Sequence, residues 1–254
     1  MGDTQDPPSK KRKTLHDYFK APNKTAGREP ALKEPKESSI SGLSVLPSFV
    51  TPSEQESIIT FLNNEAWRTD LSRRTIHYGG TYCLIPPKTA TAAERAAIER
   101  NIIPAPPIPI ELHWLIDRMV TYSLYDEHAR PEYCIVNEYL PGQGISAHVE
   151  NFRFGEPVCS LTLGSGDFMR FHELAAPHDG SVRSFKAAQA PRTGRREDVW
   201  LPSGSLAVLT GDARYRWQHE IVRGRKGKEA DWRRVSLTFR VEVKAQASGR
   251  EQRV

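Results

Sequence analysis

The sequence contains no long apolar run, and none approaches the roughly 18 apolar residues that a membrane-spanning helix needs. Its first residues, Met-Gly-Asp-Thr-Gln-Asp-Pro-Pro, lack the apolar stretch of a secretory signal, so we expect none. Cysteine is also scarce. The three cysteines, Cys83, Cys134 and Cys159, show no paired spacing, which excludes a disulfide framework and predicts a reducing compartment.

Charge is abundant, and its balance is basic. Charged residues make up 26% of the 254 residues, and the formal net charge is +5 with a pI of about 9.1. A positive field attracts polyanions, so nucleic acid is a candidate partner, although many soluble proteins are equally basic. Apolar residues (38%) suffice for one globular body, and the length favours one domain with tails over two domains.

The composition divides the chain into three parts. Residues 1–40 are rich in Lys, Pro, Ser and Glu and cannot bury enough apolar surface to offset their chain entropy, which predicts a disordered tail. Residues 41–245 form the predicted folded domain, and residues 246–254 a flexible C-terminal tail.

Within the domain, the sequence predicts helices first and short strands afterwards. A capping box at Thr51-Pro-Ser-Glu54 predicts the start of one helix, and an apolar stripe over Leu112–Tyr122 predicts a second. Period-two or β-branched runs predict strands over 133–139, 158–163, 167–172, 205–210 and 235–243, with a polar, Arg-rich loop over 174–198. This order predicts an α+β fold, with helices packed on a β-sandwich or a double-stranded β-helix (jelly roll).

His148-Val-Glu150 has the spacing of a metal site. Residues i and i+2 of an extended segment point the same way, so the imidazole and the carboxylate converge. With His219 they would give two histidines and one carboxylate, which leave coordination positions of Fe(II) open for co-substrate and O₂. The alternative is that these histidines are ordinary core or surface residues.

The last predicted strand places two arginines on one polar face. Arg234, Ser236, Thr238 and Arg240 alternate with apolar residues. Two guanidinium groups facing a core need an anion, and a dicarboxylate fits because guanidinium binds carboxylate in bidentate geometry. The alternative is a half-exposed edge strand whose polar face is solvated.

Several motifs in order resemble the AlkB family of Fe(II)/2-oxoglutarate dioxygenases, over roughly residues 43–243. They are Asn137-Glu-Tyr139-Leu-Pro-Gly-Gln-Gly-Ile145, His148-Val-Glu150, Ser160-Leu-Thr-Leu-Gly-Ser165, the Gly211–Ile221 stretch and Arg234-x-Ser236-x-Thr238-x-Arg240.

The resemblance implies a jelly-roll core that uses Fe(II), with 2-oxoglutarate and O₂ as co-substrates. It implies iron ligands at His148, Glu150 and His219, hydrogen bonds to 2-oxoglutarate from Asn137 and Tyr139, and contacts to its carboxylates from Arg234, Ser236 and Arg240. One residue departs from the family pattern, which has Asp where this chain has Glu150. The extra methylene moves the carboxylate by about one bond length. Iron binding is either retained or lost, and in the second case the chain is a non-catalytic, nucleic-acid-binding relative.

The family chemistry predicts oxidative demethylation of alkylated bases in nucleic acid, in DNA repair. The alternatives are a tRNA base hydroxylase or RNA demethylase, or a protein substrate. A base must leave its stack to reach a buried iron, and basic and aromatic side chains offset that cost. The candidates for this role, some of which could instead be surface or core residues, are Arg73, Arg74, His77, Tyr78, Tyr82 and Trp217.

Two short motifs lie in the predicted N-terminal tail. Lys10-Lys-Arg-Lys13 predicts nuclear import, against the alternative of chance basic clustering. Leu15, Tyr18 and Phe19 resemble the peptide with which replication and repair proteins bind the sliding clamp, although Arg12 stands where that motif prefers Gln. The alternative is that these apolar residues cover the chain's own body. We further expect a monomer.

Overall fold

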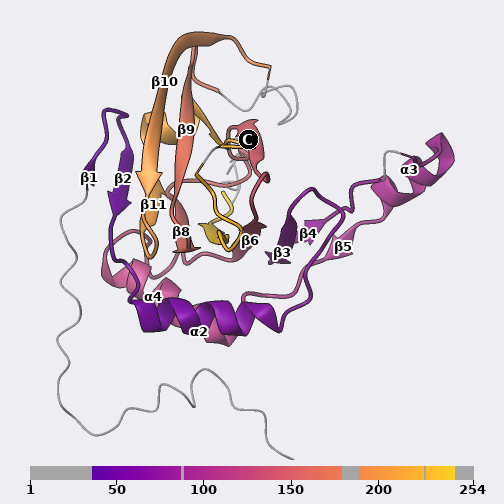
Figure 1. The fold of residues 1–254 in the computed structure, drawn as a ribbon, viewed down its shortest axis with the longest axis horizontal. Coiled ribbons are helices and arrows are strands. Elements are labelled where there is room, and N and C mark those ends of the chain that lie inside the picture. The colour runs from indigo at the N-terminus through magenta and orange to yellow at the C-terminus, as the bar shows by residue number, and fades with distance from the viewer. Residues whose placement is uncertain (1–35, 87–88, 179–188, 226, 244–254) are drawn as a thin grey trace, which may run out of the picture.

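The computed structural model describes residues 36–86, 89–178, 189–225 and 227–243 (Figure 1). Most of the predicted N-terminal tail and all of the predicted C-terminal tail lie outside the described residues. The described residues form two main antiparallel sheets, with helices at one side and an arm that extends from one edge.

The larger sheet contains seven strands and the smaller one four. The seven-stranded sheet has the order β1 (Lys36–Glu37), β2 (Leu43–Leu46), β11 (Leu206–Leu209), β8 (Val158–Gly164), β13 (Arg234–Arg240), β6 (Tyr133–Tyr139) and β3 (Arg74–Tyr78). The four-stranded sheet has the order β10 (Arg192–Leu201), β9 (Asp167–Leu174), β12 (Trp217–Ile221) and β7 (Ile145–His148). Every neighbouring pair is antiparallel.

The folded body begins earlier than the sequence indicated. The prediction assigned residues up to 40 to the tail, but Lys36 and Glu37 pair with Val45 and Ser44 of β2. Ile40 is 1% exposed and belongs to the core between the sheets. One apolar side chain in a polar segment is a weak signal in the sequence, and its burial depends on strands far along the chain.

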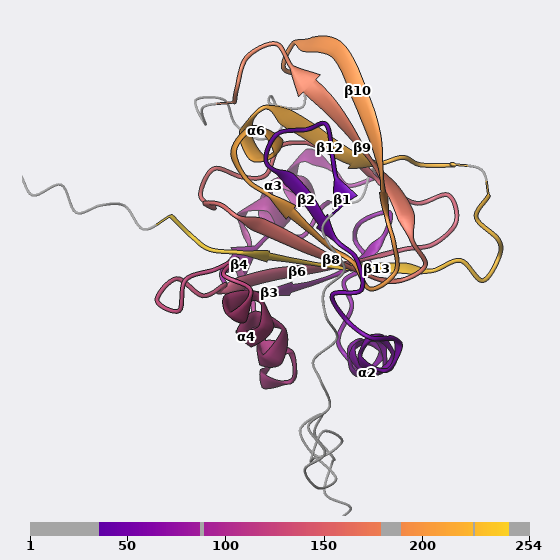
Figure 2. The same cartoon turned by 90° about the vertical axis from the view of Figure 1, so that its left-hand side faces the viewer.

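Two helices cover the outer face of the seven-stranded sheet (Figure 2). Helix α2 (Pro52–Asn63) starts at the predicted capping box, in which the Thr51 hydroxyl accepts from the Glu54 N–H and the Glu54 carboxylate accepts from the Thr51 N–H. A short 3-10 turn, η1 (Ile110–Leu112), leads into α4 (His113–Thr121). None of the described helices is long and apolar enough to cross a membrane.

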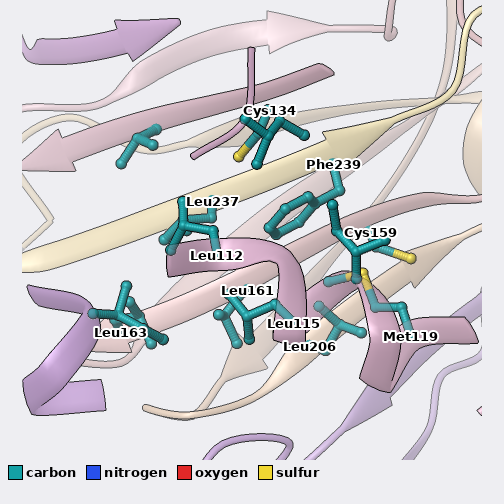
Figure 3. Packing of buried hydrophobic residues seen from close by; sticks show 14 of the residues in the cluster. Leu112, Leu115, Met119, Cys134, Cys159, Leu161, Leu163, Leu206, Leu237 and Phe239 are labelled. Atoms are coloured by element: carbon teal, nitrogen blue, oxygen red, sulfur yellow. The ribbon is translucent and has the colours of Figure 1, made fainter. Parts of the chain in front are cut away.

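The main core fills the space between these helices and the sheet (Figure 3). Leu112, Leu115 and Met119 pack against Leu237 and Phe239 of β13. Fully burying a side chain of this size stabilises the fold by about 1.5–3 kcal/mol. Since the apolar residues of β13 face the helices, its polar residues face the other way, into the space between the two sheets.

The predicted loop over residues 174–198 is wrong in its second part. β10 occupies Arg192–Leu201 and pairs with β9. It is an edge strand with one neighbour, so its outward side chains are charged and their pattern does not alternate with apolar residues. Arg170 of β9 and Asp198 of β10 face each other, with 2.7 Å between Nε and Oδ1.

An arm projects beyond β3, the far edge of the seven-stranded sheet (Figure 1). It contains the short strands β4 (Thr81–Tyr82) and β5 (Ile103–Pro104), which pair with each other, and the helix α3 (Ala92–Arg100). The helix, which we did not predict from the sequence, begins at a second capping box formed by Thr91 and Glu94.

Candidate metal centre and co-substrate pocket

Two neighbouring strands of the smaller sheet bring the two histidines together. His148 of β7 and His219 of β12 are directly opposite in register, and their ring centroids are 4.5 Å apart. Glu150 follows β7 by two residues, and its Oε1 lies 3.5 Å from Nε2 of His219 and 4.0 Å from Nε2 of His148. The structure thus places the three predicted ligands around one point.

The donor atoms fit a metal ion. One ligand atom from each residue lies within 4.8 Å of the others. Nδ1 of His148 donates to the Ser146 carbonyl at 2.8 Å, which leaves the Nε2 lone pair free for a metal. Burial, and then the neighbouring His219, lower the pKa of His148 to about 4, so the ring is neutral at about pH 7. Two imidazoles and a carboxylate form the ligand set of non-haem Fe(II).

Glu150 is held in place by a buried ion pair with Arg240. Nε of Arg240 donates to Oε2 at 2.7 Å, and Nη2 donates to Oε1 at 3.0 Å. Burial raises the pKa of the Glu150 carboxyl, but the Arg240 guanidinium outweighs it and holds this pKa well below its usual range. Each carboxylate oxygen has two lone pairs, so the ion pair leaves room for a metal bond. The longer side chain of Glu, compared with Asp, reaches Arg240 with both oxygens.

This ion pair bears on the role assigned to Arg240. The resemblance implied that Arg240 holds a carboxylate of 2-oxoglutarate, whereas here its guanidinium is engaged by Glu150, with a further bond from Nη1 to the Thr238 carbonyl at 3.3 Å. A contact from Arg240 to 2-oxoglutarate would therefore have to share the guanidinium with Glu150.

The polar face of β13 lies inside the protein. Arg234, Ser236, Thr238 and Arg240 are all buried, because β13 has β8 on one side and β6 on the other. The alternative of a solvated edge strand is therefore wrong. Opposite Arg234 and Ser236 in register stand Tyr139 and Asn137 of β6.

Arg234 has unused hydrogen-bonding capacity. Its Nη2 donates to the Thr162 hydroxyl at 2.9 Å, while its buried Nε has no hydrogen-bond partner among the residues that the structure describes. Burial lowers the pKa of this guanidinium, and an anion beside it would offset that cost. Together with Asn137, Tyr139 and Ser236, Arg234 lines the same pocket as the three metal-ligand candidates. A cationic group with an unsatisfied donor in a pocket beside a metal site fits a carboxylate of 2-oxoglutarate.

Three of the predicted substrate residues lie toward the pocket. Nε of Arg73 donates to Oδ1 of the pocket residue Asn137 at 2.8 Å. His77 is on the same face of the sheet, since Thr75 is opposite Asn137 and His77 is two residues further along β3. The Tyr82 ring lies 5.0 Å from that of His77, and the Arg68 guanidinium lies 4.2 Å from the Tyr82 centroid.

The structure does not bring the other three predicted substrate residues into this group. Arg74 and Tyr78 lie an odd number of residues from His77 along β3. Their side chains therefore point to the opposite face of the sheet, toward the helices. Arg74 pairs there with Glu138, and Tyr78 is 2% exposed in the main core. Trp217 is also 2% exposed and packs in the core between the sheets.

Sequence reasoning missed two residues at this site. Arg214 donates to the backbone carbonyl of Glu150 at 2.9 Å, and Thr162 is the hydroxyl partner of Arg234. Arg214 lies within the Gly211–Ile221 motif, so a signal was present, but its partners are carbonyls, which no side-chain pattern reveals.

Comparison with known proteins agrees with this geometry. Residues 42–240 match the 2OG-Fe(II) oxygenase superfamily, so the chain belongs to this family. It is an AlkB-like member, and therefore an Fe(II)- and 2-oxoglutarate-dependent dioxygenase. A structure titled OsALKBH1 superposes with a TM-score of 0.53 at 16% identity, covering 80% of this chain and 100% of that one, which shows the same fold.

The relatives are distant in sequence. An uncharacterised protein of Acanthamoeba polyphaga mimivirus is 28% identical over 214 residues, which cover 81% of this chain and 87% of that protein. An Arabidopsis thaliana protein named as an alkylated DNA repair ALKBH8 homolog is 27% identical over 220 residues, covering 80% and 59% of the two chains. The Macaca fascicularis tRNA (carboxymethyluridine(34)-5-O)-methyltransferase ALKBH8 is 35% identical over 99 residues, which make up only 12% of that protein.

The described residues have separate roles in such a site. When bound, Fe(II) and 2-oxoglutarate supply the oxidising power to insert an oxygen atom from O₂ into a C–H bond. His148, Glu150 and His219 would hold the metal, with Arg240 orienting the Glu150 carboxylate. Arg234 would hold the co-substrate.

Proposed function

We propose that this dioxygenase oxidatively demethylates alkylated bases in nucleic acid, and that its substrate is nuclear DNA under repair. The observation that carries the proposal is the group of Arg73, His77 and Tyr82 along the β3 edge, in which Arg73 contacts the pocket residue Asn137 and the Tyr82 ring lies against His77. A target base must be extruded from its stack, and aromatic faces and cations next to a pocket compensate for that loss. The arm that carries Tyr82 is attached at the same edge.

The proposed reaction oxidises and removes one N-methyl group. One atom of O₂ becomes the hydroxyl on the methyl carbon, and the other enters the succinate that forms with CO₂ from 2-oxoglutarate. The resulting N–CH₂–OH group breaks at its C–N bond, the nitrogen regains a proton, and the carbon leaves as formaldehyde. The base is restored without breaking the strand.

RNA is the second candidate substrate, and the relatives favour it as much as DNA. The Arabidopsis RNA demethylases ALKBH10B and ALKBH9B are 26% and 24% identical to this chain over 148 and 182 residues. The Arabidopsis ALKBH8 homolog, by contrast, is named for alkylated DNA repair.

A matched pair of oligonucleotides tests the proposal. DNA and RNA of the same sequence, each with one N-methylated base, are incubated with the protein, Fe(II) and 2-oxoglutarate. We expect loss of the methyl group by mass, with formaldehyde and succinate in equal amounts, and faster turnover of DNA. Faster turnover of RNA would support the second candidate. If the protein binds both oligonucleotides but releases no formaldehyde, and His148→Ala leaves this binding unchanged, the chain is a binding module without catalysis.

The proposed nuclear location and the sliding-clamp partner rest on residues outside those described. Lys10–Lys13 would direct nuclear import, and Leu15, Tyr18 and Phe19 would occupy the apolar pocket of the clamp. A peptide of residues 8–24 titrated against the clamp should bind, and Tyr18→Ala with Phe19→Ala should abolish binding. No binding of the unmodified peptide would leave only the import motif. Analytical ultracentrifugation would test the expected monomer.

A further inference from the structure

A buried arginine, Arg214, donates hydrogen bonds to the backbone of Glu150 and of the residues that follow it. It lies in α6 (Gly211–Tyr215), the short helix that precedes β12, and it is 1% exposed. Nη1 donates to the Glu150 carbonyl at 2.9 Å, and Nη2 donates to the carbonyls of Asn151 and Phe154 at 2.9 and 2.8 Å. One guanidinium thus holds three carbonyls of the turn that follows the metal-ligand candidate.

The surroundings of Arg214 contain rings instead of a direct counter-ion. No carboxylate of the described residues lies within ion-pair distance of its guanidinium, which is 5.3 Å from the Phe152 centroid and 4.8 Å from that of Tyr215. A buried cation is costly unless its donors are satisfied. Nη1 and Nη2 are satisfied by backbone carbonyls, while the buried Nε has no hydrogen-bond partner among the residues that the structure describes. The bonds of the two Nη groups fix the main-chain path of this turn.

Helix α6 also links that path to the second histidine. The Gly211 N–H donates to Oε2 of Glu156 at 2.5 Å, so the helix contacts the 150–156 segment at two points. After α6 the chain runs directly into β12, where His219 stands five residues beyond Arg214. The same short element therefore connects the Glu150 turn with the strand that carries His219.

We infer that Arg214 is a positioning residue for the metal centre. It fixes the backbone of Glu150 relative to His219, while Arg240 orients the carboxylate at the other end of the same residue. Glu has one more rotatable bond than Asp. Fixing the position of the Glu150 carboxylate therefore requires contacts both to the backbone of the residue and to the carboxylate itself. Arg214 does not touch the metal and acts only through Glu150.

Metal affinity separates this role from a general contribution to folding. Co(II) is titrated into the metal-free full-length chain, and the visible absorption gives both affinity and coordination. We expect one Co(II) per chain, lost in His219→Ala. Loss of a group that orients a ligand weakens metal binding by about 10- to 100-fold. Arg214→Met should fall in this range with an altered spectrum, and Arg214→Lys, which keeps a donor, should recover part of the affinity.

Arg118→Met is the matched control. Arg118 also donates to a backbone carbonyl, that of Phe49 at 2.9 Å, but it contacts α2 on the helix side of the sheet. This variant should lose stability and keep the Co(II) affinity and spectrum of the unmodified chain. If Arg214→Met does not fold, Arg214→Lys carries the measurement. A folded Arg214 variant with unchanged Co(II) binding would overturn the inference, as would an equal loss in Arg118→Met. Absence of Co(II) binding by the unmodified chain would refute the metal centre itself.

Discussion

Replacing Glu150 with Gln removes the negative charge from the buried pair with Arg240 and keeps the shape of the side chain. Both members are less than 10% exposed, so the Arg240 guanidinium would be left as a buried cation without its counter-ion. Removing one partner of such a pair costs about 3–5 kcal/mol. The Gln oxygen can still accept one of the two bonds that the carboxylate accepts at 2.7 and 3.0 Å, so we expect the lower end, about 3 kcal/mol.

Urea unfolding of the metal-free protein at about pH 7 measures this loss. The control is Glu127→Gln, which removes the charge from an exposed pair with Arg130 and should change the free energy of unfolding by less than about 1 kcal/mol. A loss in Glu150→Gln no larger than in this control would refute the buried ion pair.

The pH dependence gives an independent check of the same pair. The pKa of Glu150 is lower in the folded chain than its ordinary value of 4.5, so the folded state binds fewer protons. The stabilisation is fully present above that ordinary value and is lost as the pH falls toward the folded pKa. The difference between the unmodified chain and Glu150→Gln should therefore shrink on acidification below about pH 4.5.

Two further predictions concern the β3 edge. Burial, and then the Arg68 charge, lower the pKa of His77 to about 4, so the free energy of unfolding should fall as the pH drops from about 6.5 toward 4. His77→Gln should reduce that slope in a urea titration, and an unchanged slope would contradict the burial of His77. Arg73→Ala should weaken oligonucleotide turnover by about tenfold or more, as expected when a charge-assisted contact is lost, because Arg73 faces the pocket. Its neighbour Arg74 pairs with Glu138 on the opposite face, so Arg74→Ala should retain turnover in the same assay, and the reverse order would show that the faces are misassigned.

Features with a local cause were predictable from the sequence. The capping box at Thr51 and Glu54 depends on residues three apart, and the alternation of Arg234–Arg240 depends on strand geometry alone, so the start of α2 and the two faces of β13 followed directly. The convergence of His148 and Glu150 rests on the same period of two. Their meeting with His219 required the family resemblance, because the pairing of β7 with β12 joins distant parts of the chain.

Features set by sheet position were not predictable. Charged residues fill β10 because it is an edge strand, which removes the alternation that signals a strand. Along β3, alternate side chains point to opposite faces of the sheet, which separates Arg74 and Tyr78 from Arg73 and His77. The sequence does not show which of the two sets faces the pocket. The pairing of Arg240 with Glu150 also joins distant residues and depends on the register of the completed sheets.

The position of β1 has a consequence for any partner of the N-terminal segment. β1 and β3 are the opposite edges of the seven-stranded sheet, so the residues before Lys36 are attached about 29 Å (six strand spacings of about 4.8 Å) from the edge that carries the arm. A protein bound to that segment would be joined to the chain at the edge opposite the arm. It would act as a tether, which raises the local concentration of the catalytic pocket along any polymer that both engage.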